Sequence, residues 1–400
     1  METAVASSGR PAAPAVGRAR EALRVLGTSV TQIEPVKRAA EEDLGLALDF
    51  ITLDGTAAQR RGALYPDTFD VYDQWFHDLD LVWPTASLQP IDIARLPNWG
   101  EVNELPRTGR LGPVAARALG GDPSRRLWVQ LDGSLGEAQT DRVSMVPTVH
   151  NADGFAVVGD IEADSWAAML DPAYAGRVLL QRDPAIGALD LLLAMGARGE
   201  LHADDIGDLS QEEADSLVAR LKEALGAGQF AGVWADEADA IAAMAEGRAA
   251  LGSLWWSGAI KLRAAGVPVR MVSPREGCRG WFGGLSLSVL AEGAPRDAAY
   301  AYINWWLSGR PGAILAANGA YMAAPDAVRR HLSDEEWSFW YAGQPAAGDI
   351  ADPFGQTIYR KGELREGGSY AERMASVVVW DTIMTEHNYL LRRWEHALGL

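Results

Sequence analysis

Short apolar runs alternate with stretches of helical periodicity along the chain from Leu23 onward. This alternation predicts an α/β protein with mostly parallel sheets, because parallel strands are joined by helices. The strands we expect are Leu23–Leu26, Ala47–Ile51, Val71–Tyr72, Phe155–Val158, Val178–Leu180, Ala250–Leu254, Val269–Val272 and Leu285–Val289. No repeat of roughly 20 to 50 residues is visible, which argues against a solenoid or a propeller.

Three helix starts are marked by a serine that is followed three residues later by a glutamate. In this capping box the hydroxyl and the carboxylate each accept a hydrogen bond from a free amide of the first turn. The pairs are Ser210/Glu213, Ser333/Glu336 and Ser369/Glu372. Leu217, Leu221 and Leu225 share one face of the first of these helices, which predicts that it packs on a sheet.

Two extended segments rich in glycine and proline, Val146–Val158 and Val269–Leu287, lie on either side of a stretch of about one domain's length. We interpret them as two crossings between lobes. The expected organisation is a disordered leader (1–22), a first lobe (23–147 and 286–325), a second lobe (148–285) and a C-terminal helical segment (326–400) that packs on the lobes.

Composition narrows the classes of partner. The 400 residues are 48% hydrophobic and only 22% charged, so the chain can bury a large core. A net charge of −18 disfavours nucleic acid and anionic membranes, which require a basic face. The longest apolar stretches, Ala188–Met195 and Ala375–Trp380, are far shorter than the roughly 20 residues of a membrane span, so we expect no membrane insertion. A small-molecule ligand fits better.

The single cysteine, Cys278, allows neither an internal disulfide nor a cysteine-based metal site. No dinucleotide, phosphate-loop, nucleophile-elbow or zinc-protease motif is present, so we expect no cofactor, no metal and no catalytic residues. Residues 1–20 are rich in Ala, Pro, Gly and Arg and lack the apolar core of a secretion signal. Either the signal was removed before Met1 or the protein is not exported.

A set of motifs in consistent order resembles the spermidine/putrescine-binding proteins of ABC importers, within extracellular solute-binding protein family 1. The motifs are Trp255–Ala259, Ala264–Pro268, Pro274–Gly277 with Trp281, the helix Pro295–Leu307, Leu96–Trp99, Val146-Pro147 and Asn318–Tyr321. The similarity covers about Leu23 to Leu332. It implies a type II periplasmic-binding-protein fold: two α/β lobes with a hinge, an interlobe ligand cleft, and a permease as docking partner.

The resemblance also indicates that the pocket is altered. Members of the family hold a polyamine with carboxylates, but three of the four acidic positions carry Val30, Ile186 and Gly283 here. Only Asp183 is retained. Because an unpaired buried charge costs several kcal/mol, polyamine binding is disfavoured. The Gly283-Gly284 pair would make the pocket roomier.

Aromatic character is retained at the positions that the resemblance assigns to the ligand. Positive charge is added by Arg182 and Arg279, whose planar fork suits carboxylate or phosphate. The expected ligand-binding residues are Trp75, His77, Arg182, Asp183, Trp255, Trp256, Arg279, Trp281 and Tyr321. They predict a flat or aromatic ligand that is neutral or anionic, such as an aromatic acid, an opine-like conjugate or pyrroloquinoline quinone. We interpret His150, Asn151 and Asp153 as hydrogen-bonded structure.

The function expected from this resemblance is that of a periplasmic ligand-binding component of an ABC importer, monomeric and without enzymatic activity. Two alternatives remain open. One is an enzyme built on the same fold, since fold alone does not determine function. The other is a classical polyamine-binding protein.

Overall fold

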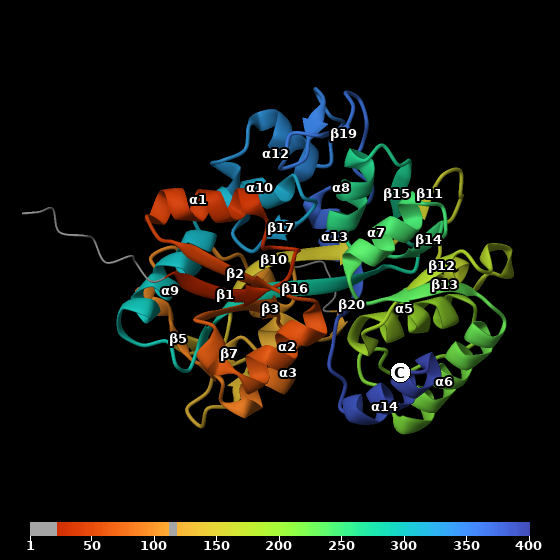
Figure 1. Ribbon diagram of the computed structural model, residues 1–400, viewed down its shortest axis with the longest axis horizontal. Coiled ribbons are helices and arrows are strands. Elements are labelled where there is room, and N and C mark those ends of the chain that lie inside the picture. The colour runs from red at the N-terminus through yellow and green to blue at the C-terminus, as the bar shows by residue number, and fades with distance from the viewer. Residues whose placement is uncertain (1–21, 112–117) are drawn as a thin grey trace, which may run out of the picture.

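The computed structural model describes residues 22–111 and 118–400. Most of the expected leader therefore lies outside the described residues. The described part is an α/β structure with two principal sheets that lie side by side (Figure 1). Each expected strand is present, with ends that differ by a few residues, and the strand expected at Leu285–Val289 begins seven residues earlier.

The first sheet has nine strands among the described residues, and its central path runs β17-β10-β16-β3-β1-β2. Its strands are β1 (Leu23–Gly27), β2 (Leu48–Thr52), β3 (Val71–Trp75), β4 (Leu88–Gln89), β6 (Leu119–Gly120), β10 (Val146–Asp153), β16 (Cys278–Ser288), β17 (Tyr321–Met322) and β20 (Val377–Trp380). β1 pairs in parallel with β2 and β3, whereas β16 runs antiparallel to β3 and β10. The carboxyl ends of β2 and β3 therefore meet at one edge.

The second sheet is ordered β13-β12-β14-β11-β15. Its strands are β11 (Phe155–Val158), β12 (Val178–Gln181), β13 (Phe230–Trp234), β14 (Leu251–Ser253) and β15 (Val269–Val272). β12 is parallel to β13 and β14, so these three strands also end at a common edge. The described residues include two small sheets as well: β5 (Ile91–Asp92), β7 (Trp128–Val129), β8 (Leu135–Gly136) and β9 (Arg142–Val143), and β18 (Ile350–Ala351) with β19 (Thr357–Tyr359).

Helices cover both sheets (Figure 1). They are α1 (Glu34–Leu44), α2 (Gly55–Leu64), α3 (Leu79–Val82), α4 (Leu105–Thr108), α5 (Pro184–Ala197), α6 (Gln211–Gly226), α7 (Glu237–Ala245), α8 (Trp256–Ala264), α9 (Gly293–Trp306), α10 (Arg310–Ala316), α11 (Pro325–Arg329), α12 (Asp334–Trp340), α13 (Tyr370–Ala375) and α14 (His387–Leu398). All three predicted capping boxes are confirmed, at the starts of α6, α12 and α13. Leu217 and Leu221 are buried, as their shared face predicts.

The chain passes between the two sheets three times. β10 continues into β11 through Gly154, where an added Cβ would lie 2.0 Å from the Val272 carbonyl oxygen, so the two crossing segments approach closely. The return runs from β15 to β16. Residues 148–153 and 278–285, which the sequence analysis places in the second lobe, pair within the first sheet.

The third passage involves the C-terminal segment, which contains strands as well as the expected helices. β20 joins the first sheet beside β16, and the chain then continues to α14, which packs against α6 and α5 under the second sheet. Figure 1 shows α14 next to α6 on that side of the molecule. The segment thus packs on both halves. Among the described residues, no helix is long and apolar enough to cross a membrane.

Candidate functional site

The site is a cavity of about 270 Å³ at the edges where the parallel strands of the two sheets end. Asp54 follows β2, Trp75 ends β3, Asp183 follows β12, Ala235 follows β13 and Trp255 follows β14. Ligand crevices of open α/β sheets form outside the carboxyl ends of strands, because the loops there leave strand-end groups exposed. The lining residues are Asp54, Gly55, Thr56, Ala57, Arg60, Trp75, Gln181, Arg182, Asp183, Ile186, Ala235 and Trp255.

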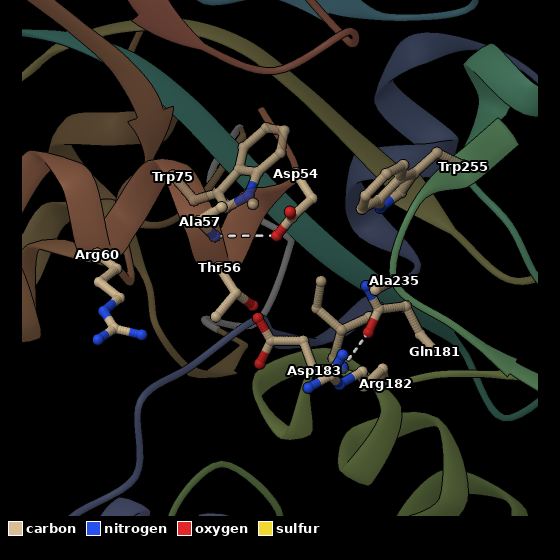
Figure 2. Close-up of a pocket in the computed structure, with 12 residues that line it drawn as sticks. Asp54, Thr56, Ala57, Arg60, Trp75, Gln181, Arg182, Asp183, Ala235 and Trp255 are labelled. Atoms are coloured by element: carbon tan, nitrogen blue, oxygen red, sulfur yellow. Dashed lines mark hydrogen bonds between the residues drawn. The ribbon is translucent and has the colours of Figure 1, made fainter. Parts of the chain in front are cut away.

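Two tryptophans form the aromatic part of this cavity (Figure 2). The ring centroids of Trp75 and Trp255 lie 6.2 Å apart, and the ring planes are inclined by 46°. Each of these rings packs against a further tryptophan in a T-shaped arrangement. Trp281 packs against Trp75 and Trp234 against Trp255, and in both pairs the ring centroids lie 5.2 Å apart. Because the two lining rings already contact each other, a flat ligand would pack against them from the cavity side and not between them.

Two aspartates cap the helices that begin at the cavity. One carboxylate oxygen of Asp54 accepts a hydrogen bond from Ala57 N–H at 2.9 Å, and Asp183 accepts one from Ala185 N–H at 2.9 Å. The second oxygen of each has no hydrogen-bond partner within the described part of the chain. Burial raises the pKa of Asp183, although its bond to Ala185 opposes the shift. Each aspartate therefore retains one oxygen for a ligand.

Two arginines balance these carboxylates. Arg60 and Arg182 line the cavity, both are exposed, and neither guanidinium forms an ion pair with another described residue. The main chain of Arg182 is fixed, since its N–H donates to the Trp234 carbonyl and its carbonyl accepts from Trp394 Nε1, both at 2.8 Å. Gln181 accepts a hydrogen bond from Asp183 N–H through its side-chain oxygen, which leaves its amide N–H groups as donors.

A second cavity of about 190 Å³ adjoins the first. The two cavities share five lining residues, namely Gly55, Thr56, Trp75, Arg182 and Asp183. The remaining lining residues of the second cavity are Gln59, Asp78, Leu81, Pro184, Ile383, His387, Asn388, Leu391 and Glu395. The cleft therefore consists of two adjoining cavities that have some lining residues in common. Helix α14 forms one side of the second cavity.

Of the predicted site residues, Trp75, Arg182, Asp183 and Trp255 line the first cavity. Trp281 lies behind Trp75, and its Nε1 donates a 2.6 Å hydrogen bond to Asp153.

His77 is also set back from both cavities. It is buried, and its Nε2 lies 3.7 Å from the carboxylate of Asp78. Burial lowers the pKa of His77 to about 3, so the ring is neutral. It supports the cleft without lining it.

Arg279 does not lie at the cavity, contrary to the expectation that it supplies charge to the ligand. It is fully buried, and its guanidinium donates to Asp190 at 2.8 Å and to Asp381 at 2.7 Å. Arg279 is the second residue of β16, Asp190 lies in α5, and Asp381 directly follows β20. The group therefore joins the two halves of the molecule.

Trp256 and Tyr321 also lie away from the cavity. Trp256 packs against two buried guanidinium groups, with Arg365 at 4.4 Å and Arg373 at 4.6 Å from its ring centroid. Tyr321 lies 4.6 Å from the same Arg365. Burial lowers the pKa of Arg365, and the aromatic faces partly compensate for its desolvation. Neither residue lines either of the two cavities described above.

His150, Asn151 and Asp153 are buried in β10. His150 Nε2 lies 2.9 Å from the Tyr370 hydroxyl, and Asn151 donates to the Gly319 carbonyl at 2.8 Å. These bonds agree with the interpretation of the cluster as hydrogen-bonded structure.

The sequence analysis missed Asp54, Thr56, Arg60 and Gln181, as well as the contribution of α14. The strand ends carried a usable signal, because a residue that directly follows a parallel strand lies at the crevice. The placement of α14 had no such signal. No cluster of three or more His, Cys, Asp or Glu side chains that could hold a metal is found in residues 22–111 and 118–400.

Comparisons with known proteins assign the chain to a family and agree with its fold. A family model described as bacterial extracellular solute-binding protein matches residues 80–338. Comparison with curated protein sequences gives no match. A putative spermidine/putrescine ABC transporter from Listeria monocytogenes has a similar fold (TM-score 0.66, 14% identity, covering 94% of this chain and 98% of that one).

Two other solved structures of similar fold are described with different ligands. One is the PBP MotA from A. tumefaciens B6 in complex with glucopine (TM-score 0.61, 14% identity, covering 94% of this chain and 99% of that one). The other is described as a GABA receptor (TM-score 0.59, 15% identity, covering 94% and 97%). At these identities the likeness shows the fold alone.

Proposed function

The chain belongs to the bacterial extracellular solute-binding proteins, and from this premise we propose that it is the periplasmic ligand-capturing component of an ABC importer. The observation that carries the proposal is the cavity between the two sheets, with lining residues from both sides. A ligand can drive closure only if it binds the closed state better than the open one, which requires contacts from both halves.

The ligand class we propose is a small organic molecule with a flat or aromatic part and no net charge. Trp75 and Trp255 offer the flat part a surface. Around them the charged groups balance, with Asp54 and Asp183 against Arg60 and Arg182. An anionic ligand such as pyrroloquinoline quinone would face two carboxylates, and a ligand with two ammonium groups would face two guanidinium groups. A ligand without net charge that carries one positive and one negative end can pair each end with an opposite charge of the cavity. It therefore avoids the cost of burying unpaired charges.

The replaced acidic positions support this choice over a polyamine. Ile186, where the resemblance expects an acid, lines the first cavity with an apolar side chain. Val30 is buried in the core, and Gly283 lies behind the site, where an added Cβ would lie 3.5 Å from the Trp75 ring. Structures of this fold are described as a putative spermidine/putrescine transporter, a glucopine complex and a GABA receptor, so the fold alone does not fix the ligand.

Native mass spectrometry of the protein purified from its own host tests the proposal first. We expect the mass of a monomer with a co-purified small molecule bound to it. Because we propose binding without chemical conversion, the mass of that molecule should stay the same after incubation with the protein. A mass that changes with time would instead show an enzyme on this fold.

A panel of named compounds tests the ligand class by thermal shift and then by calorimetry. The panel contains the amino acids, γ-aminobutyrate, glucopine, putrescine and spermidine. We expect any binder to lose affinity in Trp255→Ala but not in Trp83→Ala, a tryptophan outside both cavities. Sub-micromolar binding of putrescine or spermidine would overturn the proposed ligand class.

A further inference from the structure

The second cavity is bounded by the last helix of the chain. α14 begins at His387, beyond residue 338, where the match to the family model ends. The helix contributes His387, Asn388, Leu391 and Glu395 to the cavity wall. A C-terminal element that lies outside the matched region thus completes a compartment of the ligand cleft.

Buried contacts fix α14 against the second half. Leu390 and Trp394 are buried in the core that includes α5 and α6. Trp394 Nε1 donates to the Arg182 carbonyl at 2.8 Å, and the Tyr389 hydroxyl donates to Asp215 at 2.8 Å. The first of these bonds ties the helix directly to the loop that carries Arg182. The wall of the second cavity is therefore a defined surface.

One face of α14 is directed at the cavity. His387, Leu391 and Glu395 are spaced by four residues, so they lie along one side of the helix. All three are partly buried. Elsewhere on the helix, Arg392 is exposed and Arg393 forms an ion pair with Asp215 of α6 at 2.6 Å.

Asp78 faces this compartment from the first half. Asp78 is 5% exposed and lines the second cavity, yet its carboxylate has no hydrogen-bond partner among the described residues. It precedes α3 but does not cap that helix. His77 Nε2 lies 3.7 Å from this carboxylate, which is too far for a hydrogen bond. A buried carboxyl without a partner calls for an explanation.

We infer that the second cavity is an ammonium-binding subsite of the ligand cleft, in which Asp78, Asp183 and Glu395 receive the cationic end of the ligand. The inference rests on the proposed function, because the same ligand would place its flat part at Trp75, which both cavities share. It makes the ligand a zwitterion whose acidic group meets Arg60 in the first cavity.

The charges around the subsite agree with this assignment. The second cavity is lined by three carboxyl groups and one guanidinium, that of Arg182. Burial raises the pKa of Asp78 well above its usual range, and Asp183, Asp381 and Asp80 raise it further. Burial lowers the pKa of His387, so its ring adds little positive charge. An ammonium group would relieve the repulsion among these carboxyl groups.

The first test needs no ligand. If Asp78 is kept for a ligand, Asp78→Asn removes a nearly buried carboxyl that no described residue stabilises, whether it is charged or protonated on folding, and raises the melting temperature at pH 8 by about 1 to 3 °C. The control is Glu212→Gln, which removes one exposed carboxylate from the neighbouring α6 and should leave the melting temperature unchanged. A lower melting temperature for Asp78→Asn would overturn the inference, because it would show a structural role.

The second test compares compounds that differ only in an amino group. The pairs are phenylalanine with 3-phenylpropionate, γ-aminobutyrate with butyrate, and 4-(aminomethyl)benzoate with 4-methylbenzoate. In calorimetry, we expect the aminated member of any pair that binds to do so at least tenfold more tightly. Asp78→Asn and Glu395→Gln should abolish that preference, whereas Glu212→Gln should preserve it.

The outcomes separate the two proposals. Equal affinity within each binding pair overturns the ammonium subsite and leaves the proposed function standing. Binding that Trp255→Ala does not weaken would contradict the proposed function instead. If none of the six compounds binds, the melting-temperature comparison alone decides whether Asp78 is kept for a ligand.

Discussion

Two neighbouring regions of this molecule use the same residue types in opposite ways. In the cleft, Trp255 and Arg182 line a cavity, and the guanidinium forms no ion pair with any described residue. In the region behind it, which we call the junction, Trp256 and Arg279 are buried among Arg365, Arg373, Asp190 and Asp381. Each charged group of the junction forms at least one buried hydrogen bond, either to another junction residue or to a nearby main-chain carbonyl. The charged groups in the cleft remain available, and this difference distinguishes binding from support.

The largest effect we expect is on stability, in the junction. Arg279→Met leaves Asp190 and Asp381 buried without their cation, which should reduce the free energy of unfolding by roughly 3 to 5 kcal/mol. Chemical denaturation measures this. The control is Arg275→Met, which removes an exposed arginine paired with Asp164 and should cost less than about 1 kcal/mol. Similar losses of unfolding free energy in Arg279→Met and Arg275→Met would contradict the structural role that we assign to the buried arginine.

Adjacent tryptophans give the sharpest form of the comparison. Trp256→Ala removes a buried ring and the surface that stabilises two guanidinium groups, so we expect a loss of roughly 3 to 5 kcal/mol in stability. Trp255→Ala should be the milder of the two in stability but should weaken ligand binding about tenfold, near 1.4 kcal/mol. Calorimetry and denaturation of both variants test this, and a larger stability loss for Trp255→Ala would reverse our assignment.

His150, a buried residue of β10, makes the stability of the protein depend on pH. Burial lowers its pKa to about 3, whereas the unfolded chain titrates near 6.5, so the unfolded state binds the extra proton as the pH falls. Stability is therefore present above pH 6.5 and is lost progressively toward pH 3. Between pH 7.5 and 5.5 the wild type should lose about 1.4 kcal/mol more than His150→Phe. Parallel pH profiles for the two proteins would contradict the burial of a neutral ring.

The smallest effect belongs to the exposed arginine of the cleft. Arg182→Gln should change stability by no more than about 0.5 kcal/mol, because the side chain forms no ion pair with a described residue. It should reduce affinity for a ligand with an acidic group by roughly threefold to tenfold. Thermal melting and calorimetry provide the two measurements. A marked loss of stability would place Arg182 with the junction residues.

Much of the fold could be predicted from the sequence because its signals are local. Strands such as Val178–Gln181 are short apolar runs, and the capping box of Ser210 and Glu213 depends on a spacing of three. The family resemblance assigns Trp75 and Trp255 to the ligand, and the structure places both at strand ends beside the cavity. These features need no knowledge of distant partners.

The roles of the arginines could not be predicted in the same way. Arg279 lies within a strand, and its partners Asp190 and Asp381 are 89 and 102 residues away along the chain. Only the folded arrangement brings the three together. Similarly, α14 reaches the cleft because Trp394 bonds to the Arg182 carbonyl, a contact across 212 residues that no local pattern indicates.

The most direct test of the central claim labels the 15 tryptophans with 5-fluorotryptophan and follows their ¹⁹F NMR signals during titration with the co-purified ligand. Trp75→Phe and Trp255→Phe assign the two cavity signals, and Trp256→Phe assigns the junction signal. We predict that the Trp75 and Trp255 signals shift most and that the Trp256 signal shifts least of the three. A shift confined to Trp256, or no shift of Trp75 and Trp255 at saturating ligand, would contradict a ligand site between the two sheets.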